Sequence, residues 1–315
     1  MTLVNADLPR PVDGVVLATV MVALSSAMFG FVPLFARGLT DAGVAPPAIA
    51  FGRYLLAAVV LSPFLVVRGV GRSASLWGLV AGASMGIGWV GYVEALEVLS
   101  VSTAGVYYMT YPLFTVLIGW IGFRDPPGIR TVFAGCMILA GALIATGGTG
   151  ETLPGVRTLA FALMAPASFG LAINILARKL IAIPPLSRIP CVCFGALLGL
   201  LPLIATLPVA ALVPSEASGW LLLLGLSIFT ALMPQLIYVI YSPRIGASAS
   251  AMAGSSELPT MFIVGWLLLG ETLTPAHVLA GALVVTAILI TPVRRSGKVS
   301  QHLARDGRSG SSGRA

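Results

Sequence analysis

A single acidic residue, Glu257, interrupts a long apolar run near the end of the chain. It lies about midway along the run 246–269, and Pro259 follows it, which removes a backbone donor and can distort a helix. An ionised carboxylate at the centre of a bilayer costs roughly 2.5 kcal/mol or more, so it has to face a cavity or a partner. Glu257 is therefore a candidate proton carrier or counter-charge for a ligand ammonium group. The alternative is a structural carboxylate that is bonded to Ser255, Ser256 or a neighbouring helix.

Arg53 is a second charge inside an apolar run, 46–67. It lies some seven residues from the start of that run, which is roughly 10 Å along a helix. Its guanidinium could bind the carboxylate of a ligand. It could also pair with Glu94 or Glu97 near the end of the next run, and we favour this structural ion pair or gate.

Aromatic and amide side chains in the apolar runs could line a pocket: Trp89, Tyr92, Tyr107, Tyr108, Tyr111, Gln235 and Tyr238. Taken singly, each of these residue types is more often a packing residue. Tyr111 precedes Pro112, which gives the first half of the chain a counterpart of the Glu257 region. Asn174 is expected to make an interhelical hydrogen bond, and His277 is expected to be a solvated residue at a helix start.

Enzyme and cofactor chemistry have little support in the sequence. The chain shows no Ser-His-Asp set, no HExxH and no P-loop, and it has only two histidines. Its three cysteines lie inside apolar runs without metal-site spacing. We therefore expect no catalytic residue, no metal and no cofactor.

The elements that position these residues must be membrane helices. Hydrophobic residues make up 57% of the 315 positions and charged residues 9%, whereas a soluble domain has about 25% charged residues. About 20 apolar residues cross the hydrocarbon core as a helix. Ten runs approach or meet this length: 14–36, 46–67, 75–97, 102–123, 128–148, 155–178, 188–212, 218–242, 246–269 and 275–293. The predicted fold class is an all-α integral membrane protein with ten transmembrane helices.

The basic residues predict the orientation. With the N-terminus inside, 15 of the 18 Lys and Arg residues fall in inner segments, only Arg37 and Arg157 fall outside, and Arg53 lies within a run. This asymmetry predicts a cytoplasmic (inner) membrane protein with both termini in the cytoplasm. The net charge of +7 sits in short segments between apolar runs, which argues against a nucleic-acid partner. Residues 1–13 form a cytoplasmic N-terminus, and the basic tail 294–315 is expected to be disordered and close to lipid headgroups.

The chain contains an internal repeat. A shift of 146 positions aligns Gly119-Trp120 with Gly265-Trp266 and Asp125 with Glu271, while a shift of 140 aligns Phe29-Gly30 with Phe169-Gly170. The two copies, 14–148 and 155–293, hold five predicted helices each. Because five is odd, the second copy enters from the opposite side, and the copies are inverted. Inverted repeats are typical of secondary transporters, and one chain then supplies both halves, so a monomer is sufficient.

Three stretches resemble a known family. They are GASASAMAGSSELPTMFIVGWLLLGETLTPAHVLAGALVVTAILI in the second half, and AIAFGRYLLAAVVLSPF and EALEVLSVSTAGVYYMTYPLFTVLIGW in the first. Together they resemble EamA-type transporters of the drug/metabolite transporter superfamily. The resemblance implies ten helices, cytoplasmic termini, and export or exchange of small metabolites, often amino acids or related compounds. The sequence departs from the family pattern at Arg124-Asp125, where Gly-Glu is usual, and at Pro259, which falls one place late.

The sequence thus predicts a secondary active transporter that exports a small metabolite by alternating access, with protons as candidate coupling ions. One alternative is an uncoupled facilitator in which Glu257 only orients the substrate. The other is a membrane protein that transports nothing, such as an assembly subunit or a lipid-modifying enzyme. The enzyme would need converging nucleophile, base or metal ligands at one membrane face, and none stands out.

Overall fold

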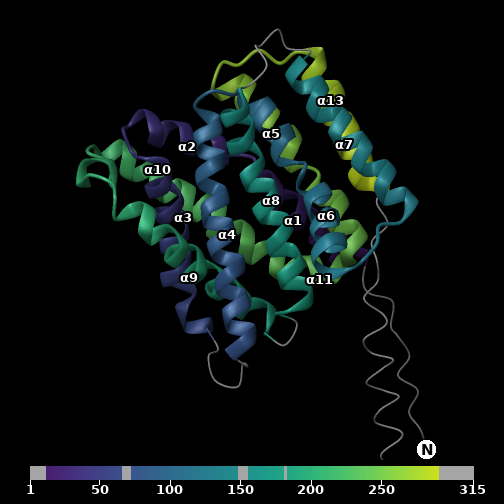
Figure 1. Ribbon diagram of the computed structural model, residues 1–315, viewed down its shortest axis with the longest axis horizontal. Coiled ribbons are helices and arrows are strands. Elements are labelled where there is room, and N and C mark those ends of the chain that lie inside the picture. Colours follow the sequence, from purple (N-terminus) through teal and green to yellow (C-terminus); the bar gives the residue numbers. More distant parts are fainter. Residues whose placement is uncertain (1–11, 66–71, 148–154, 181–182, 291–315) are drawn as a thin grey trace, which may run out of the picture.

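The computed structural model describes residues 12–65, 72–147, 155–180 and 183–290, and these are helical with no strand among them (Figure 1). The predicted disordered tail 294–315 and residues 1–11 of the predicted N-terminal segment lie outside the described residues. The first half contains α1 (Val12–Phe29), α2 (Val32–Asp41), α3 (Pro46–Leu61), α4 (Arg72–Leu96), α5 (Val101–Tyr108), α6 (Tyr111–Phe123) and α7 (Ile129–Gly147). The second half contains α8 (Val156–Arg178), α9 (Pro185–Ile204), α10 (Ala217–Ser227), α11 (Met233–Gly254), α12 (Glu257–Ile263) and α13 (Pro275–Ile290). Two π-helical segments, η3 (Ile228–Leu232) and η4 (Val264–Leu268), extend α10 and α12.

Seven helical segments are long and apolar enough to cross a membrane, and each overlaps a predicted run. Three shorter apolar helices, Ile129–Ala145, Glu257–Leu268 and Pro275–Ile290, overlap the remaining three. Large apolar side chains remain exposed along these segments, as lipid contact requires. The chain is therefore a multi-pass helical membrane protein.

Three apolar segments are interrupted near their middle. α1 and α2 are separated at Gly30-Phe31, α5 and α6 at Met109-Thr110, and α11 and α12 at Ser255-Ser256. Proline stands at the beginning of two of the resumed helices, α2 and α6, where its missing N–H costs little. A break frees backbone polar groups, and inside a membrane these are tolerated only where they are buried in protein or line a cavity. The breaks therefore indicate positions at which free backbone polar groups are buried in the protein or line a cavity.

Two predicted boundaries differ from the structure. The run 188–212 ends early, because α9 stops at Ile204. The predicted turn at 242–246 lies inside α11, yet the hydroxyl of Ser250 donates to the carbonyl of Ser242 at 3.2 Å. Residues eight apart on a straight helix are about 12 Å apart along its axis. α11 therefore bends sharply beside its internal Pro243, which changes the chain direction without a conventional loop.

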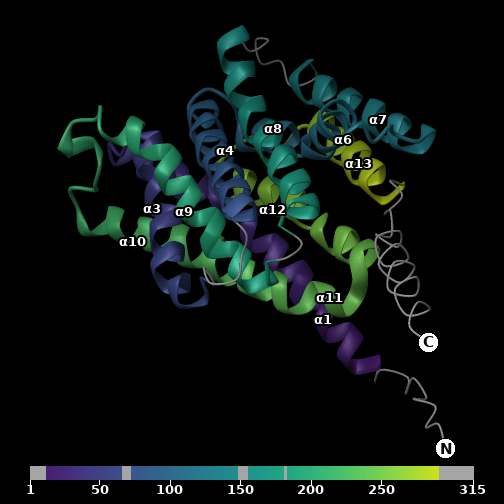
Figure 2. The same cartoon turned by 60° about the horizontal axis from the view of Figure 1, so that its bottom comes forward.

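α4 packs between α8 and α9 (Figure 1 and Figure 2), and glycines make both contacts close. A Cβ at Gly82 would collide with the carbonyl oxygen of Val192 on α9. A Cβ at Gly88 would lie 2.6 Å from Ser168, and one at Gly91 2.7 Å from Met164, both on α8. These α4 glycines therefore allow close packing, because two helices of the second half approach the backbone of α4 directly.

The close contact between Gly82 on α4 and Val192 on α9 leads to a prediction about stability. Gly82→Ala is expected to lower the stability of the protein by about 1–3 kcal/mol, because its methyl group overlaps a backbone oxygen that cannot rotate away. Gly122→Ala is the matched control, since a Cβ there meets nothing within 4 Å. Thermal unfolding in detergent measures both variants. Equal melting temperatures would contradict the close α4–α9 contact.

Candidate functional site

An aromatic cluster occupies the centre of the bundle beside the α5–α6 break. The ring centroids of Trp89 and Tyr92 on α4 are 5.1 Å apart, and Tyr92 lies 5.7 Å from Tyr108 on α5. Tyr108 lies 6.0 Å from Tyr111, which contacts Phe169 on α8 edge to face at 5.0 Å. These separations are typical of favourable aromatic pairs. The structure thus brings Trp89, Tyr92, Tyr108 and Tyr111 into one cluster.

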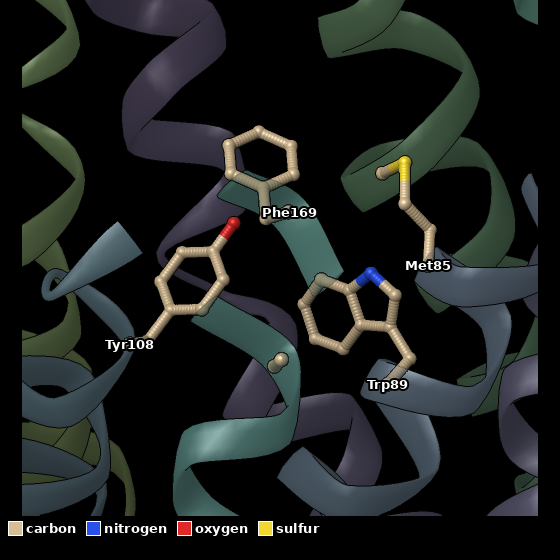
Figure 3. A pocket seen from close by; sticks show the side chains of 5 residues that line it. Met85, Trp89, Tyr108 and Phe169 are labelled. Carbon is tan, nitrogen blue, oxygen red and sulfur yellow. The ribbon is translucent and has the colours of Figure 1, made fainter. Parts of the chain in front are cut away.

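A small cavity opens on this cluster, lined by Met85, Trp89, Tyr108, Ala165 and Phe169. Figure 3 shows the Trp89, Tyr108 and Phe169 rings around it, with Met85 beside Trp89. The cavity holds about one water molecule. A metabolite would enter only if these helices moved apart.

Arg53 on α3 lies against this cluster. Its side chain is 6% exposed, and its guanidinium carbon stands 3.9 Å from the Trp89 ring centroid, a close cation–π contact. Its Nη2 donates to the carbonyl of Thr230 at 3.0 Å, while its Nη1 is buried without a hydrogen-bond partner. Burying a guanidinium N–H without a hydrogen-bond partner costs free energy. This free donor is suited to bind an anionic group.

The partner of Arg53 has a local explanation. In an α-helix the carbonyl of Thr230 would accept from residue 234, but that residue is Pro234 and has no N–H. The segment η3, which contains Thr230, adopts π-helical geometry just before this proline. A π-helical segment disturbs the regular bonding of the helix and often marks a functional site. Arg53 therefore donates to the carbonyl of Thr230, which lacks its usual helical donor because of Pro234.

Glu257 is the first residue of α12, directly after the α11–α12 break. Its side chain is half-buried and has no hydrogen-bond partner among the residues that the structure describes. Its charge interacts electrostatically with Arg53, Tyr92, Tyr108 and Tyr111. The predicted alternative partner Ser256 instead donates to the carbonyl of Ala23 at 2.7 Å. The Ser256 hydroxyl therefore does not hold the Glu257 carboxylate.

The remaining candidates are more dispersed. Tyr238 is half-buried. Tyr107 is buried in the packed interior, and Gln235 is exposed. Asn174 confirms its predicted role, because its amide donates to the carbonyl of Thr115 on α6 at 2.9 Å.

Two predictions about charged or titratable residues are wrong. Arg53 does not pair with Glu94 or Glu97, because Trp89 and Thr230 hold its side chain, and Glu97 is exposed at the end of α4. His277 is not solvated but 2% exposed, with its Nε2 3.1 Å from the Thr103 hydroxyl.

Sequence reasoning also missed several residues of this region. Phe169 completes the aromatic cluster, and its place beside Gly170 in the repeat was the available signal. Two ion pairs within the described residues were missed as well. Arg37 pairs with Glu271 at 2.6 Å, and Arg178 with Asp125 at 2.9 Å.

Comparison with known proteins bears on the class of this protein. Residues 16–147 match the model of the EamA-like transporter family, which confirms the resemblance stated from the sequence. No curated protein matches the chain. A solved structure described only as "Crystal structure of protein" is similar with a TM-score of 0.61 and 17% sequence identity. The similarity covers 91% of this chain and 99% of that one, so it shows a shared fold.

Proposed function

We propose that the chain is a secondary transporter that exports a small metabolite, an amino acid or a related compound, across the cytoplasmic membrane by alternating access. The observation that carries the proposal is the central pair of opposite charges. Arg53, which stacks on Trp89, offers a donor without a hydrogen-bond partner, and the Glu257 carboxylate interacts electrostatically with this guanidinium. A substrate with an anionic and a cationic group would satisfy both.

Contacts between the halves support an inverted repeat. A Cβ at Gly30 would lie 2.7 Å from Thr260 on α12, and one at Gly170 would lie 2.7 Å from Thr115 and 2.9 Å from Phe114 on α6. The shift of 140 relates the two glycines, and the shift of 146 relates Phe114 to Thr260. Each half thus packs its first helix onto the start of a resumed helix of the other half. Such reciprocal packing is expected when two related halves can rock around one site.

Proton coupling is the form of the proposal in which Glu257 carries the coupling ion. Its carboxylate interacts electrostatically with Tyr108 of the aromatic cluster and with Arg53. A proton and a substrate ammonium would then compete for the same carboxylate. An inward proton gradient would drive the substrate outward. In this proposal both termini lie in the cytoplasm and one chain holds the whole site.

A metabolite screen with purified protein in proteoliposomes tests the proposal, with and without an imposed pH gradient. We expect flux of one class of zwitterionic compound, stimulated by the gradient. Flux that ignores the gradient would support the uncoupled facilitator instead. No flux from folded protein over a broad panel, with stable co-purification of a partner, would support the non-transporting alternative and overturn the proposal.

A further inference from the structure

The Arg37–Glu271 pair holds together four segments at one end of the bundle. Arg37 near the end of α2 also donates to the carbonyl of Leu96, the last residue of α4, at 3.3 Å and to that of Leu99 at 2.7 Å. Glu271 follows η4 and accepts from the backbone N–H of Val101, the first residue of α5, at 2.8 and 2.9 Å. We call this end the α5 end. Charge-assisted bonds of this kind are short and strong.

The Arg178–Asp125 pair lies at the other end of the same membrane segment. Val101 begins the apolar segment Val101–Phe123, and Asp125 comes two residues after it ends. Its 23 residues correspond to about 35 Å along a helix. The ion pair at this second end, the α6 end, joins α6 to the last residue of α8. Arg178 also donates to Asn174 at 3.4 Å.

Asp125 and Glu271 lie in backbone turns of the same kind. The N–H of Asp125 donates to the carbonyl of Gly119 at 3.1 Å, and the N–H of Glu271 donates to that of Gly265 at 2.9 Å. Each acid follows a residue in the left-handed region, Arg124 with φ 54° and Gly270 with φ 68°. The shift of 146 relates all these positions pairwise. Under the shift of 140 Arg37 falls one residue from Arg178, so the basic partners correspond as well.

We propose that the two ion pairs are latches, one for each end of the bundle, and that transport requires them to open in alternation. This inference rests on the proposed function, because only a protein that opens at both ends needs two latches. Opening the α5 end separates α2 from η4 and must break Arg37–Glu271. Opening the α6 end separates α6 from α8 and must break Arg178–Asp125. Both pairs are formed in the described structure, and the cavity beside the aromatic cluster holds about one water molecule.

The two latches are unequal. The Arg37 and Glu271 side chains are 26% and 13% exposed, whereas Arg178 and Asp125 are 37% and 32% exposed. Breaking a more buried, multiply bonded pair is expensive, whereas an exposed pair contributes little. The α6 end is therefore expected to open more readily than the α5 end. In the predicted orientation the α6 end faces the cytoplasm, from which an exporter loads its substrate.

Distances between spin labels test the latches without any substrate. In a variant without the three native cysteines, labels at Ala42→Cys and Leu273→Cys report on the α5 end, and labels at Ala177→Cys and Ile121→Cys on the α6 end. All four positions are exposed. Glu271→Gln is expected to add a longer distance at the α5 end only, and Asp125→Asn at the α6 end only.

Two further variants keep the test decisive. Arg37→Gln breaks the first latch from its other side and should reproduce the effect of Glu271→Gln, which separates latch opening from misfolding of one variant. Glu97→Gln is the control, because Glu97 is an exposed acid at the α5 end. Unchanged distances in the latch variants, or equal lengthening at both ends in each of them, would overturn the proposal. The distance measurements do not require transport, so their result does not depend on knowing the substrate. They can therefore fail or succeed independently of the proposed function.

Discussion

Glu257→Gln is expected to abolish the pH-gradient dependence of flux and to weaken substrate binding by roughly 10- to 100-fold. Glutamine keeps the shape of the side chain but has neither a charge nor a proton to release at neutral pH. A hydrogen bond to a charged group contributes about 1.5–3 kcal/mol, which is the stated range in affinity. Flux into proteoliposomes over a series of imposed gradients measures both effects.

The matched control for this variant is Glu97→Gln, which removes an exposed carboxylate outside the aromatic cluster. It should leave flux and its gradient dependence unchanged. If Glu257→Gln retained the full gradient dependence, Glu257 would not be the proton carrier. If it also retained substrate affinity, the site would lie elsewhere.

Arg53→Lys is expected to raise the KM for the substrate at least roughly tenfold, although the positive charge remains. Lysine lacks the planar fork with which Arg53 stacks on Trp89 and reaches Thr230 while leaving Nη1 for an anion. One charge-assisted bond lost corresponds to about tenfold in affinity. Concentration-dependent flux in proteoliposomes gives the KM.

Arg157→Lys serves as the comparison, because Arg157 is exposed near the start of α8. It should behave like the unsubstituted protein. An unchanged KM in Arg53→Lys, with unchanged thermal stability in both variants, would mean that Arg53 is a packing residue and not an anion anchor.

The membrane segments could be predicted because a bilayer demands long apolar runs, and each predicted run overlaps an observed apolar helix. The breaks could not be placed as well. Phe29-Gly30-Phe31 reads as a continuous apolar run, and the interruption depends on the close packing of Gly30 against Thr260. The bend inside α11 has a signal in Pro243, but only the tertiary contacts decide between a kink and a loop.

The candidate site, too, could be predicted from the sequence only in part. Aromatic residues in apolar runs could be proposed as pocket-lining residues, and four of them do form one cluster. The partner of Arg53 could not be predicted, since it is a backbone carbonyl 177 residues away that becomes available through Pro234. The ion pair of Arg37 and Glu271 spans 234 positions and joins two residues that look like ordinary segment ends. The sequence shows which residues are charged, but which of them form ion pairs depends on how the two halves of the chain pack together.

Two-sided accessibility of the central cavity tests most directly whether this protein exposes one site alternately to both sides of the membrane. Phe169→Cys, in a variant without the native cysteines, places a single thiol on the cavity wall. A small membrane-impermeant thiol reagent is applied to intact cells and, separately, to inverted vesicles. The account predicts labelling from both sides, slowed by the transported compound. Labelling from one side only, unaffected by that compound, would contradict it.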